Sequence, residues 1–319
     1  MTTAMRRSIG MITATALLVA GCSAGQGDPK VALTVGDVKV STVEQIQRTL
    51  TDLLATNQGA QEQARQHKLD QVSRGIVTQQ AVHQLIAETA QREGIQIPDA
   101  LAEQAIPQLT GPEATQGDPF QSIVDAAFPA KEIARYRLML VELGRRAIGR
   151  AAITFDAAFP QNFDDARELA RKIAADPTQS AALMQATPNP QQDAIINQTQ
   201  SPATVQDPSQ LLQLAGTPLF NVPVGSVVAT RLGGEQGGYV VFYLKARQTA
   251  AQPAGFDASQ IPLMQLAQVG QAQLMDVALK TRIEPNPRFG TWDPINLRVV
   301  SGEEAAVVST VHQAAATKP

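Results

Sequence analysis

The sequence contains very few of the residues that build disulfides, metal sites and catalytic nucleophiles. Its 319 residues include a single cysteine, Cys22, and three histidines. A lone cysteine cannot form a disulfide within the chain, so ordinary packing has to hold the core together. No HExxH, CxxC, P-loop or GxSxG motif is present, and no pair of histidines has metal-ligand spacing. We therefore expect no metal ion and no other cofactor.

Aromatic residues and runs of positive charge are also scarce. Aromatics make up 4% of the chain, the formal net charge is −3 at pH 7, and no basic block occurs. A mildly acidic chain without a basic patch is a poor partner for nucleic acid, and we expect no nucleic-acid binding. The length suggests one large domain or two smaller ones.

The N-terminal segment has the layout of a secretory signal peptide. Arg6 and Arg7 give a positive start, an apolar stretch covers residues 9–20, and small residues precede Cys22. The apolar stretch is too short to span a bilayer as a permanent helix. We therefore expect residues 1–21 to be removed. An ordinary signal peptide followed by an incidental cysteine is the alternative.

The run Leu-Leu-Val-Ala-Gly before Cys22 resembles the lipobox of bacterial lipoproteins. In that family the cysteine thiol receives a diacylglyceryl group, and the new amino terminus is acylated. The resemblance implies a mature protein that begins at Cys22 and is lipid-anchored to the cell membrane outside the cytoplasm, because two or more acyl chains anchor a protein stably. Residues 22–29 are small and polar, which predicts a flexible tether.

Residues 30–149 predict a short pair of strands followed by helices. The pattern alternates at 31–35 and at 38–40, around a Gly-Asp turn. Ser41 and Glu44 have the spacing of a capping box at the start of a helix. Apolar residues at helical spacing predict further helices near 69–94, 101–109 and 129–149.

The character of the chain changes near residue 150. Residues 150–248 predict a small α+β unit that ends in a β-hairpin at 227–232 and 239–244. Within it, residues 176–208 are expected to be a loop with a helical fragment. A helical period returns in 256–300, and residues 301–319 are expected to be a disordered tail.

Three stretches carry a resemblance to the SurA/PrsA class of extracytoplasmic foldases. Residues 31–41 (Val-Ala-Leu-Thr-Val-Gly-Asp-Val-Lys-Val-Ser) are similar to the opening of the SurA N-terminal domain, and residues 86–99 resemble a later segment of it, where a helix ends at glycine and restarts after an Asp cap. Residues 150–248 resemble a parvulin domain, most clearly at 220–225 and 238–244. The resemblance implies an α+β fold, in which a mainly helical SurA N-terminal-like body is completed by a C-terminal helix and carries a small parvulin-like insert.

Active parvulins resemble one another in placing one histidine in the first strand and another in the last. Ala152 and Val240 stand at these two places, and all three histidines lie outside residues 150–248. Isomerisation of a peptide bond has a barrier of about 18–20 kcal/mol, which parvulins lower with a polar network around the proline amide. The resemblance therefore implies that isomerase activity is weak or lost.

One histidine and two methionines are candidates for contact residues. His83 lies on the apolar line of the long helix, with Gln79 one turn before it. A hydrogen-bonded histidine in a helix interface is the expected role, in preference to a ligand or pH sensor. Met264 and Met275 are candidates for an adaptable apolar surface that contacts unfolded segments, and core packing explains each of them equally well.

Three functions remain open. The first is a membrane-anchored, chaperone-like lipoprotein that binds unfolded or exported polypeptides without ATP. The second is a peptidyl-prolyl cis-trans isomerase of the parvulin type, with Phe220, Tyr239 and Phe242 contacting the peptide. The third is a scaffold lipoprotein dedicated to one envelope partner. The missing histidines count against the second, and nothing in the sequence separates the first from the third.

Overall fold

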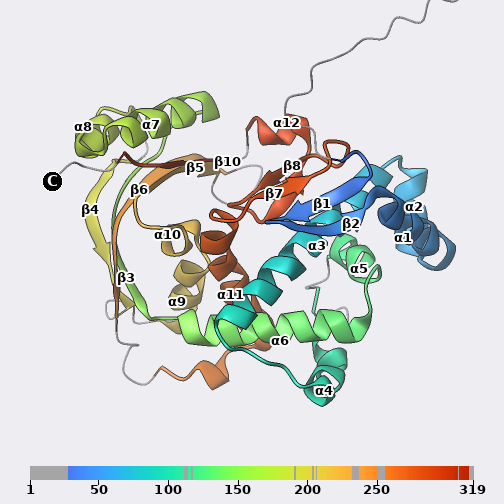
Figure 1. Cartoon of the computed structure of the whole chain (residues 1–319). Helices are drawn as coiled ribbons and strands as arrows, with labels where there is room; N and C mark the ends of the chain where they lie inside the picture. The colour runs from blue at the N-terminus through green and yellow to red at the C-terminus, as the bar shows by residue number, and fades with distance from the viewer. Residues whose placement is uncertain are drawn as a thin grey trace, which may run out of the picture.

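The computed structural model shows an α+β protein (Figure 1). It describes residues 28–110, 114–115, 118–189, 192–202, 205, 207–231, 237–250, 256–307 and 309–315. The expected signal peptide, the lipidation residue Cys22 and residues 23–27 of the tether lie outside these ranges. None of the helices in the described part is long and apolar enough to cross a membrane.

A three-stranded antiparallel sheet joins the first described residues to the C-terminal part of the chain. β1 (Val31–Val35) lies between β2 (Val38–Thr42) and β7 (Ile283–Pro285). Gly36 makes the turn between β1 and β2 with φ of 57°, a left-handed conformation that glycine adopts without strain. The pairing of β1 with β7 holds together two segments that lie far apart in the sequence.

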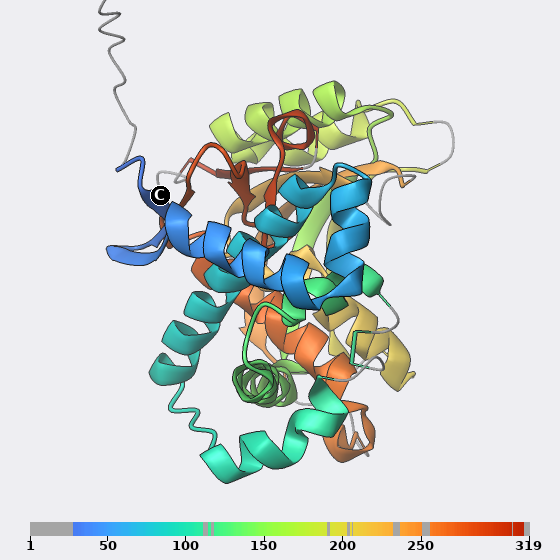
Figure 2. The ribbon, with the colours of Figure 1, turned by 90° about the vertical axis from the view of Figure 1, so that its right-hand side faces the viewer.

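Three helices of the N-terminal half, α1, α3 and α6, share one hydrophobic core with α11 from the C-terminal part of the chain. The long helix α3 is buried along much of its length. Figure 2 shows α6 along its axis, with α11 beside it. The helices of this part are α1 (Val43–Thr56), α2 (Gln58–Arg65), α3 (Leu69–Arg92), α4 (Asp99–Leu109), α5 (Pro119–Asp125), α6 (Ala130–Ala147) and α11 (Leu263–Ala278).

Helices α6 and α11 cross with their backbones in contact. A Cβ atom added to Gly270 would lie 1.9 Å from the carbonyl oxygen of Leu140, and one added to Gly144 would lie 2.0 Å from the carbonyl oxygen of Leu266. Only a residue without a side chain permits this approach. The crossing therefore fixes the C-terminal helix to the N-terminal helices.

A second sheet has five antiparallel strands in the order β10-β5-β6-β3-β4. Side chains of β3 alternate between its two faces, as the pleat of a strand requires. Ile153, Phe155 and Ala157 face a cluster that includes residues of α10, whereas Ala158 faces α7. The strands are β3 (Ala151–Ala158), β4 (Ile195–Gln200), β5 (Ser226–Arg231), β6 (Tyr239–Thr249) and β10 (Ser309–Gln313).

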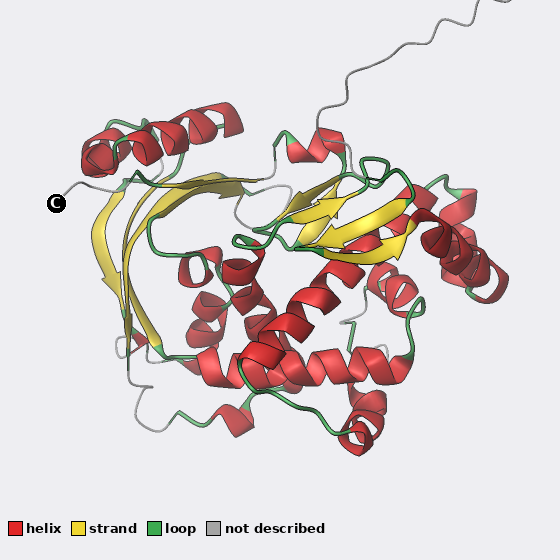
Figure 3. Ribbon diagram, viewed as in Figure 1, coloured by secondary structure: helices red, strands yellow, loops and turns green. Residues whose placement is uncertain are grey.

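Helices cover both faces of this sheet (Figure 3). One face packs against α7 (Phe163–Ala175) and α8 (Ser180–Gln185). On the opposite side lie α9 (Pro208–Ala215), α10 (Pro218–Asn221) and the C-terminal end of α11. The predicted hairpin partners, now β5 and β6, are neighbours in the sheet.

A two-stranded sheet of β8 (Thr291–Asp293) and β9 (Arg298–Val300) lies next to α3. The backbone N–H of Val299 donates to the hydroxyl oxygen of Thr78 on α3, at 2.9 Å. Phe289 is buried in the main core. These contacts fix the C-terminal segment to the helical part. Two single turns of 3-10 helix, η1 (Pro177–Gln179) and η3 (Ala258–Gln260), lie in the connections before α8 and α11.

The expectation of a disordered tail at 301–319 is wrong for the described residues 301–307 and 309–315. α12 (Gly302–Ala305) and β10 both fall in this range, and β10 pairs with β5 from Ser309–Thr230 to Gln313–Ser226. The outer edge of β5 carries backbone N–H and C=O groups that need partners. A short polar segment satisfies them although its own sequence lacks a strand pattern.

Candidate functional site

A cavity of about 480 Å³ lies between α3, α5, α6, α11 and the loop that precedes β9. Its wall has an apolar part, an amide part and three charged side chains, those of Asp118, Arg137 and Arg298. The apolar part is formed by Val82, Ile86, Ile133, Leu140, Met264 and Leu297. The amide part is formed by Gln79, Gln121, Gln268, Gln271 and Asn296.

His83 is a buried titratable group in the wall of this cavity, and its side chain is held on every side. The ring stacks on Tyr136 with centroids 4.0 Å apart and meets Phe128 edge-on at 5.1 Å. The ring atom Nε2 lies 2.7 Å from the amide nitrogen of Gln79, and Nδ1 lies 3.7 Å from a carboxylate oxygen of Glu132. The predicted role, a hydrogen-bonded histidine in a helix interface, is confirmed.

Burial decides the charge state of His83. Desolvation lowers the pKa of its imidazole, and the nearby carboxylate of Glu132 opposes this only in part. The same contact holds the pKa of Glu132 below its usual value, and burial raises the pKa of the Tyr136 phenol. At neutral pH the imidazole is therefore uncharged, with one N–H donor and one acceptor nitrogen. His83 contributes hydrogen-bonding capacity to the wall and no positive charge.

A buried ion pair stabilises the wall formed by α5 and α6. The guanidinium Nη2 of Arg137 lies 2.6 Å from Oδ2 of Asp125, and the two side chains are 11% and 9% exposed. The amide of Gln121 donates to Oδ1 of Asp125 at 2.8 Å, and Arg137 also donates to the carbonyl oxygen of Leu109. A buried pair with these additional hydrogen bonds offsets the cost of removing both charges from water. It holds α5 against α6 beside the cavity.

The wall offers few side chains of the kind that act as nucleophiles. The described lining residues include no serine or cysteine, and their hydroxyl groups belong to Thr78, Thr115 and Tyr136. Thr78 accepts from the backbone of Val299, and the hydroxyl of Thr115 pairs with that of Ser122 at 3.0 Å. The hydroxyl of Thr78 is therefore engaged by a backbone amide and not by the general base that activates a nucleophile. Over the described ranges, no group of three or more His, Cys, Asp or Glu side chains is arranged to hold a metal ion.

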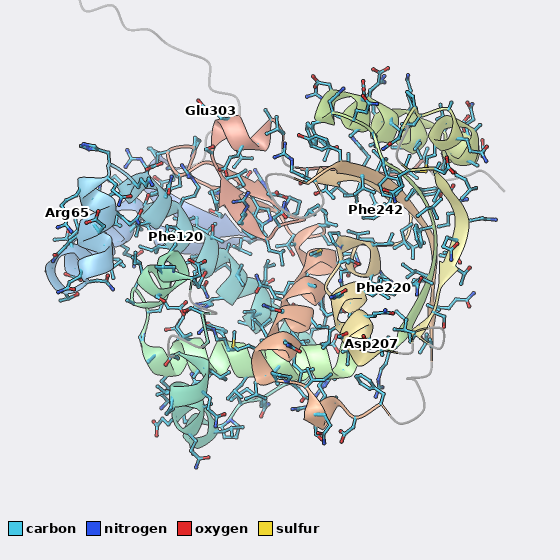
Figure 4. All side chains as sticks on the ribbon, turned by 180° about the vertical axis from the view of Figure 1, so that it is seen from behind. Arg65, Phe120, Asp207, Phe220, Phe242 and Glu303 are labelled. Atoms are coloured by element: carbon cyan, nitrogen blue, oxygen red, sulfur yellow. The ribbon has the colours of Figure 1, made fainter. Side chains whose placement is uncertain are left out.

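The residues predicted to contact a peptide are scattered. Met264 lies in the wall of this cavity. Met275 and Phe242 are 7% and 4% exposed and belong to the hydrophobic core, so the prediction is wrong for these two. Tyr239 is half-buried. Phe220 lines a separate cavity of about 210 Å³. Figure 4 labels Phe220 on α10, next to the sheet that carries Phe242.

The two positions at which the resemblance expects histidines are not brought together. Ala152 in β3 pairs with Gln248 near the end of β6, whereas Val240 lies at the start of β6 and pairs with Thr230. Because a strand rises about 3.3 Å per residue, the two positions lie more than ~20 Å apart. Histidines at both places would not share one proline site. This corrects the expected arrangement.

Sequence reasoning did not identify the neighbours of His83. Tyr136 falls on the apolar line of α6, and nothing local shows that this line faces α3. Asp125 and Arg137 carry a weak signal, since opposite charges among apolar residues of successive helices are candidates for a buried pair.

Comparison with known proteins assigns no family to this arrangement. No protein-family model matches the chain. No curated protein matches it either.

Proposed function

We propose that this protein is a lipid-anchored, extracytoplasmic polypeptide-binding protein of the SurA/PrsA kind, which holds unfolded or exported chains without ATP. The observation that carries the proposal is the cavity of about 480 Å³ with its joint apolar and amide wall. Its volume falls in the range of sites that enclose small ligands, roughly 300–1,000 Å³. It therefore accommodates a few residues of a chain and not a folded domain.

The chemistry of the wall suits a polypeptide of any sequence. Every peptide unit presents one N–H and one C=O, and a glutamine amide supplies both an acceptor and two donors. Gln268 and Gln271 place such groups beside apolar side chains. Met264 has an unbranched and polarisable side chain that adapts to different partners. Amides for the backbone and an adaptable apolar wall for side chains together favour binding without sequence preference.

The rest of the described surface offers little apolar area for a client. The large hydrophobic residues classed as exposed are Val38, Leu101, Val224 and Val307, between 43% and 48% exposed. They belong to different parts of the fold, and isolated apolar residues of this kind are normal on a protein surface. A client is therefore expected to be held in the cavity.

Blocking the cavity should abolish client binding. Gln268 and Gln265 are both exposed on α11, but only Gln268 lines the cavity. We expect a soluble form that begins at Ser23 to suppress the aggregation of several chemically unfolded clients, measured by light scattering at near-stoichiometric ratios. Gln268→Trp should lose most of this suppression because the indole fills the cavity, and Gln265→Trp should keep it.

Other outcomes of this experiment are also informative. Suppression that survives Gln268→Trp would place the client elsewhere and contradict the role of the cavity. No suppression of any client by the unmodified protein would contradict a general holdase and favour a scaffold with one dedicated partner. The isomerase alternative gains nothing from the fold, since Ala152 and Val240 stand far apart.

The membrane anchor is tested separately. Cys22→Ala removes the sulfur that the lipobox resemblance assigns to the diacylglyceryl group. We expect the variant to move from the membrane fraction to the soluble fraction, because it lacks the acyl chains that anchor a protein stably. Membrane fractionation followed by mass determination of the N-terminal peptide measures both effects. Unchanged retention in the membrane would contradict lipidation.

A further inference from the structure

The cavity of about 210 Å³ lies apart from the proposed client site, where the end of α6 and the start of β3 meet α9, α10 and β6. Its lining includes the apolar side chains of Leu211, Leu214 and Phe220 and the polar side chains of Ser201 and Gln273. Two positively charged side chains, Arg150 and Arg247, line the same cavity. Two guanidinium groups beside apolar side chains favour a negatively charged occupant that has an apolar part.

Arg247 is bound by the protein, but its charge is not neutralised. Its Nη2 donates to the backbone carbonyl oxygens of Phe220 and Val222, at 2.7 and 2.6 Å. Its Nε is buried and has no hydrogen-bond partner among the described residues. Burial lowers the pKa of the guanidinium. Carbonyl dipoles orient the group, yet they do not replace a full negative charge.

No carboxylate of the described residues compensates the two arginines. Neither Arg150 nor Arg247 forms an ion pair with any side chain described in the structure. Asp276 acts on Arg247 only through longer-range electrostatics, and its carboxylate pairs with Lys280 at 2.7 Å. A half-buried guanidinium without a counter-ion is costly and is normally paired in proteins.

We propose that this cavity binds a carboxylate attached to one small apolar group. The guanidinium groups of Arg247 and Arg150 hold the carboxylate, and the apolar group lies on Phe220 and the two leucines. The volume is smaller than that of a site for a drug-sized ligand, so the occupant is about one residue in size. Two sources offer this chemistry, the free C-terminal residue of a polypeptide and a free organic acid. Binding in this cavity does not depend on the proposed client site.

The test uses N-acetyl-leucine as the probe and N-acetyl-leucinamide as its uncharged counterpart. Titration into the soluble protein that begins at Ser23, followed by calorimetry or by amide chemical shifts, measures the two affinities. We expect the carboxylate to bind about tenfold or more tightly than the amide, since a hydrogen bond to a charged group contributes more than one to a neutral group. Equal binding of both probes, or binding of neither at millimolar concentration, overturns the proposal.

Substitutions locate the bound carboxylate. Arg150 is exposed, so Arg150→Gln leaves the fold intact and should weaken N-acetyl-leucine severalfold. Arg247→Gln should weaken it tenfold or more, with circular dichroism as a check on folding. Arg145→Gln is the matched control, because Arg145 lies nearby at the end of α6, pairs with Glu142 and does not line the cavity. Loss of binding in the control, or unchanged binding in Arg150→Gln and Arg247→Gln, overturns the assignment.

A second pair of probes distinguishes the two sources. A short unstructured peptide with C-terminal leucine is compared with the same peptide carrying a C-terminal amide. Binding of the free peptide at least as tightly as N-acetyl-leucine identifies the end of a polypeptide as the occupant. Much weaker binding of the peptide identifies a small organic acid, because the cavity then excludes a continuing chain.

Discussion

Replacement of Gly270 by alanine is expected to lower the free energy of unfolding by about 3 kcal/mol or more. The added Cβ would lie 1.9 Å from the carbonyl oxygen of Leu140 and 2.7 Å from its carbon, and these are backbone atoms of a packed helix. They cannot rotate aside as a side chain does, so α11 has to move away from α6. Separation of the helices loses dispersion contacts along the whole interface. Urea unfolding followed by circular dichroism measures the change.

The sign of this effect makes the experiment informative. In an unconstrained helix, alanine is more favourable than glycine by about 1 kcal/mol, so a clash is needed to reverse the preference. Gly302→Ala is the control, because nothing lies within 4 Å of its added Cβ on α12. We expect the control to be neutral or slightly stabilising. Equal behaviour of the two variants would contradict the close crossing.

The double variant tests whether Gly144 and Gly270 act at one contact. The Cβ of Gly144→Ala would lie 2.0 Å from the carbonyl oxygen of Leu266, so both substitutions push the same two backbones apart. Once one has separated the helices, the second has room. The cost of Gly144→Ala with Gly270→Ala should therefore be clearly smaller than the sum of the single costs. Additive costs would mean that the two glycines act separately.

Local sequence patterns predicted most helices well. The expected helix at 129–149 appears as α6 at Ala130–Ala147, and the long helix ends at Arg92, near the glycine that was expected to stop it. The predicted capping box is displaced by one residue. Thr42 and Gln45 form it, because Ser41 is buried and donates to the side-chain oxygen of Gln80 at 2.6 Å. The tertiary contact of Ser41 with Gln80 therefore leaves Thr42 as the N-cap of α1.

Strands at the sheet edges could not be predicted, because their stability comes from their neighbours. β4 has the sequence Ile-Ile-Asn-Gln-Thr-Gln and lies within a segment expected to be loop with a helical fragment. β10 lies within the expected tail. Both segments are largely polar and exposed or half-buried, so neither shows apolar alternation. Backbone hydrogen bonds to β3 and β5 supply the stability that contacts between apolar side chains do not provide.

The candidate site was predictable only in its local part. Gln79 and His83 lie one turn apart on one helix, so their contact follows from the sequence. The cavity itself needs α3, α6, α11 and the loop before β9 together. The contact of α6 with α11 at Gly144 and Gly270 holds these elements together. In the sequence, a glycine within a helical pattern indicates only that the helix is less stable at that position. Its packing role becomes visible when both helices are placed.

Replacement of Asp156 by alanine is expected to lower the free energy of unfolding by about 3–5 kcal/mol. The carboxylate is fully buried in β3 and is satisfied by three elements. Oδ1 lies 2.7 Å from Nζ of Lys245 and accepts from the backbone N–H of Asn197, also at 2.7 Å. Oδ2 accepts from the hydroxyl of Ser180 at 2.6 Å. Alanine leaves these donors without their acceptor.

The network holds an irregular part of β4 in place. The pairing of β3 with β4 shifts register between Phe155 and Ala157, and Asn197 adopts φ of 56° opposite this shift. A left-handed conformation at a residue other than glycine costs free energy unless its surroundings fix it. The bond from Asn197 N–H to Asp156 supplies this fixation. Faster hydrogen exchange in β4 than in β5 should therefore accompany Asp156→Ala.

Asp156→Asn separates the acceptor role of this side chain from its charge. The asparagine oxygen still accepts from Asn197, and its amide can donate to the hydroxyl of Ser180, so mainly the ion pair with Lys245 is lost. Because the Lys245 side chain is 25% exposed, water solvates part of the unpaired ammonium group. Asp156→Asn should therefore cost less than Asp156→Ala, about 1–2 kcal/mol. The exposed Asp193→Asn, as control, should change stability by less than about 0.5 kcal/mol. If both Asp156 variants lower the free energy of unfolding equally, the hydrogen bond from Asn197 contributes little. The fold would then require the negative charge of Asp156 at this position.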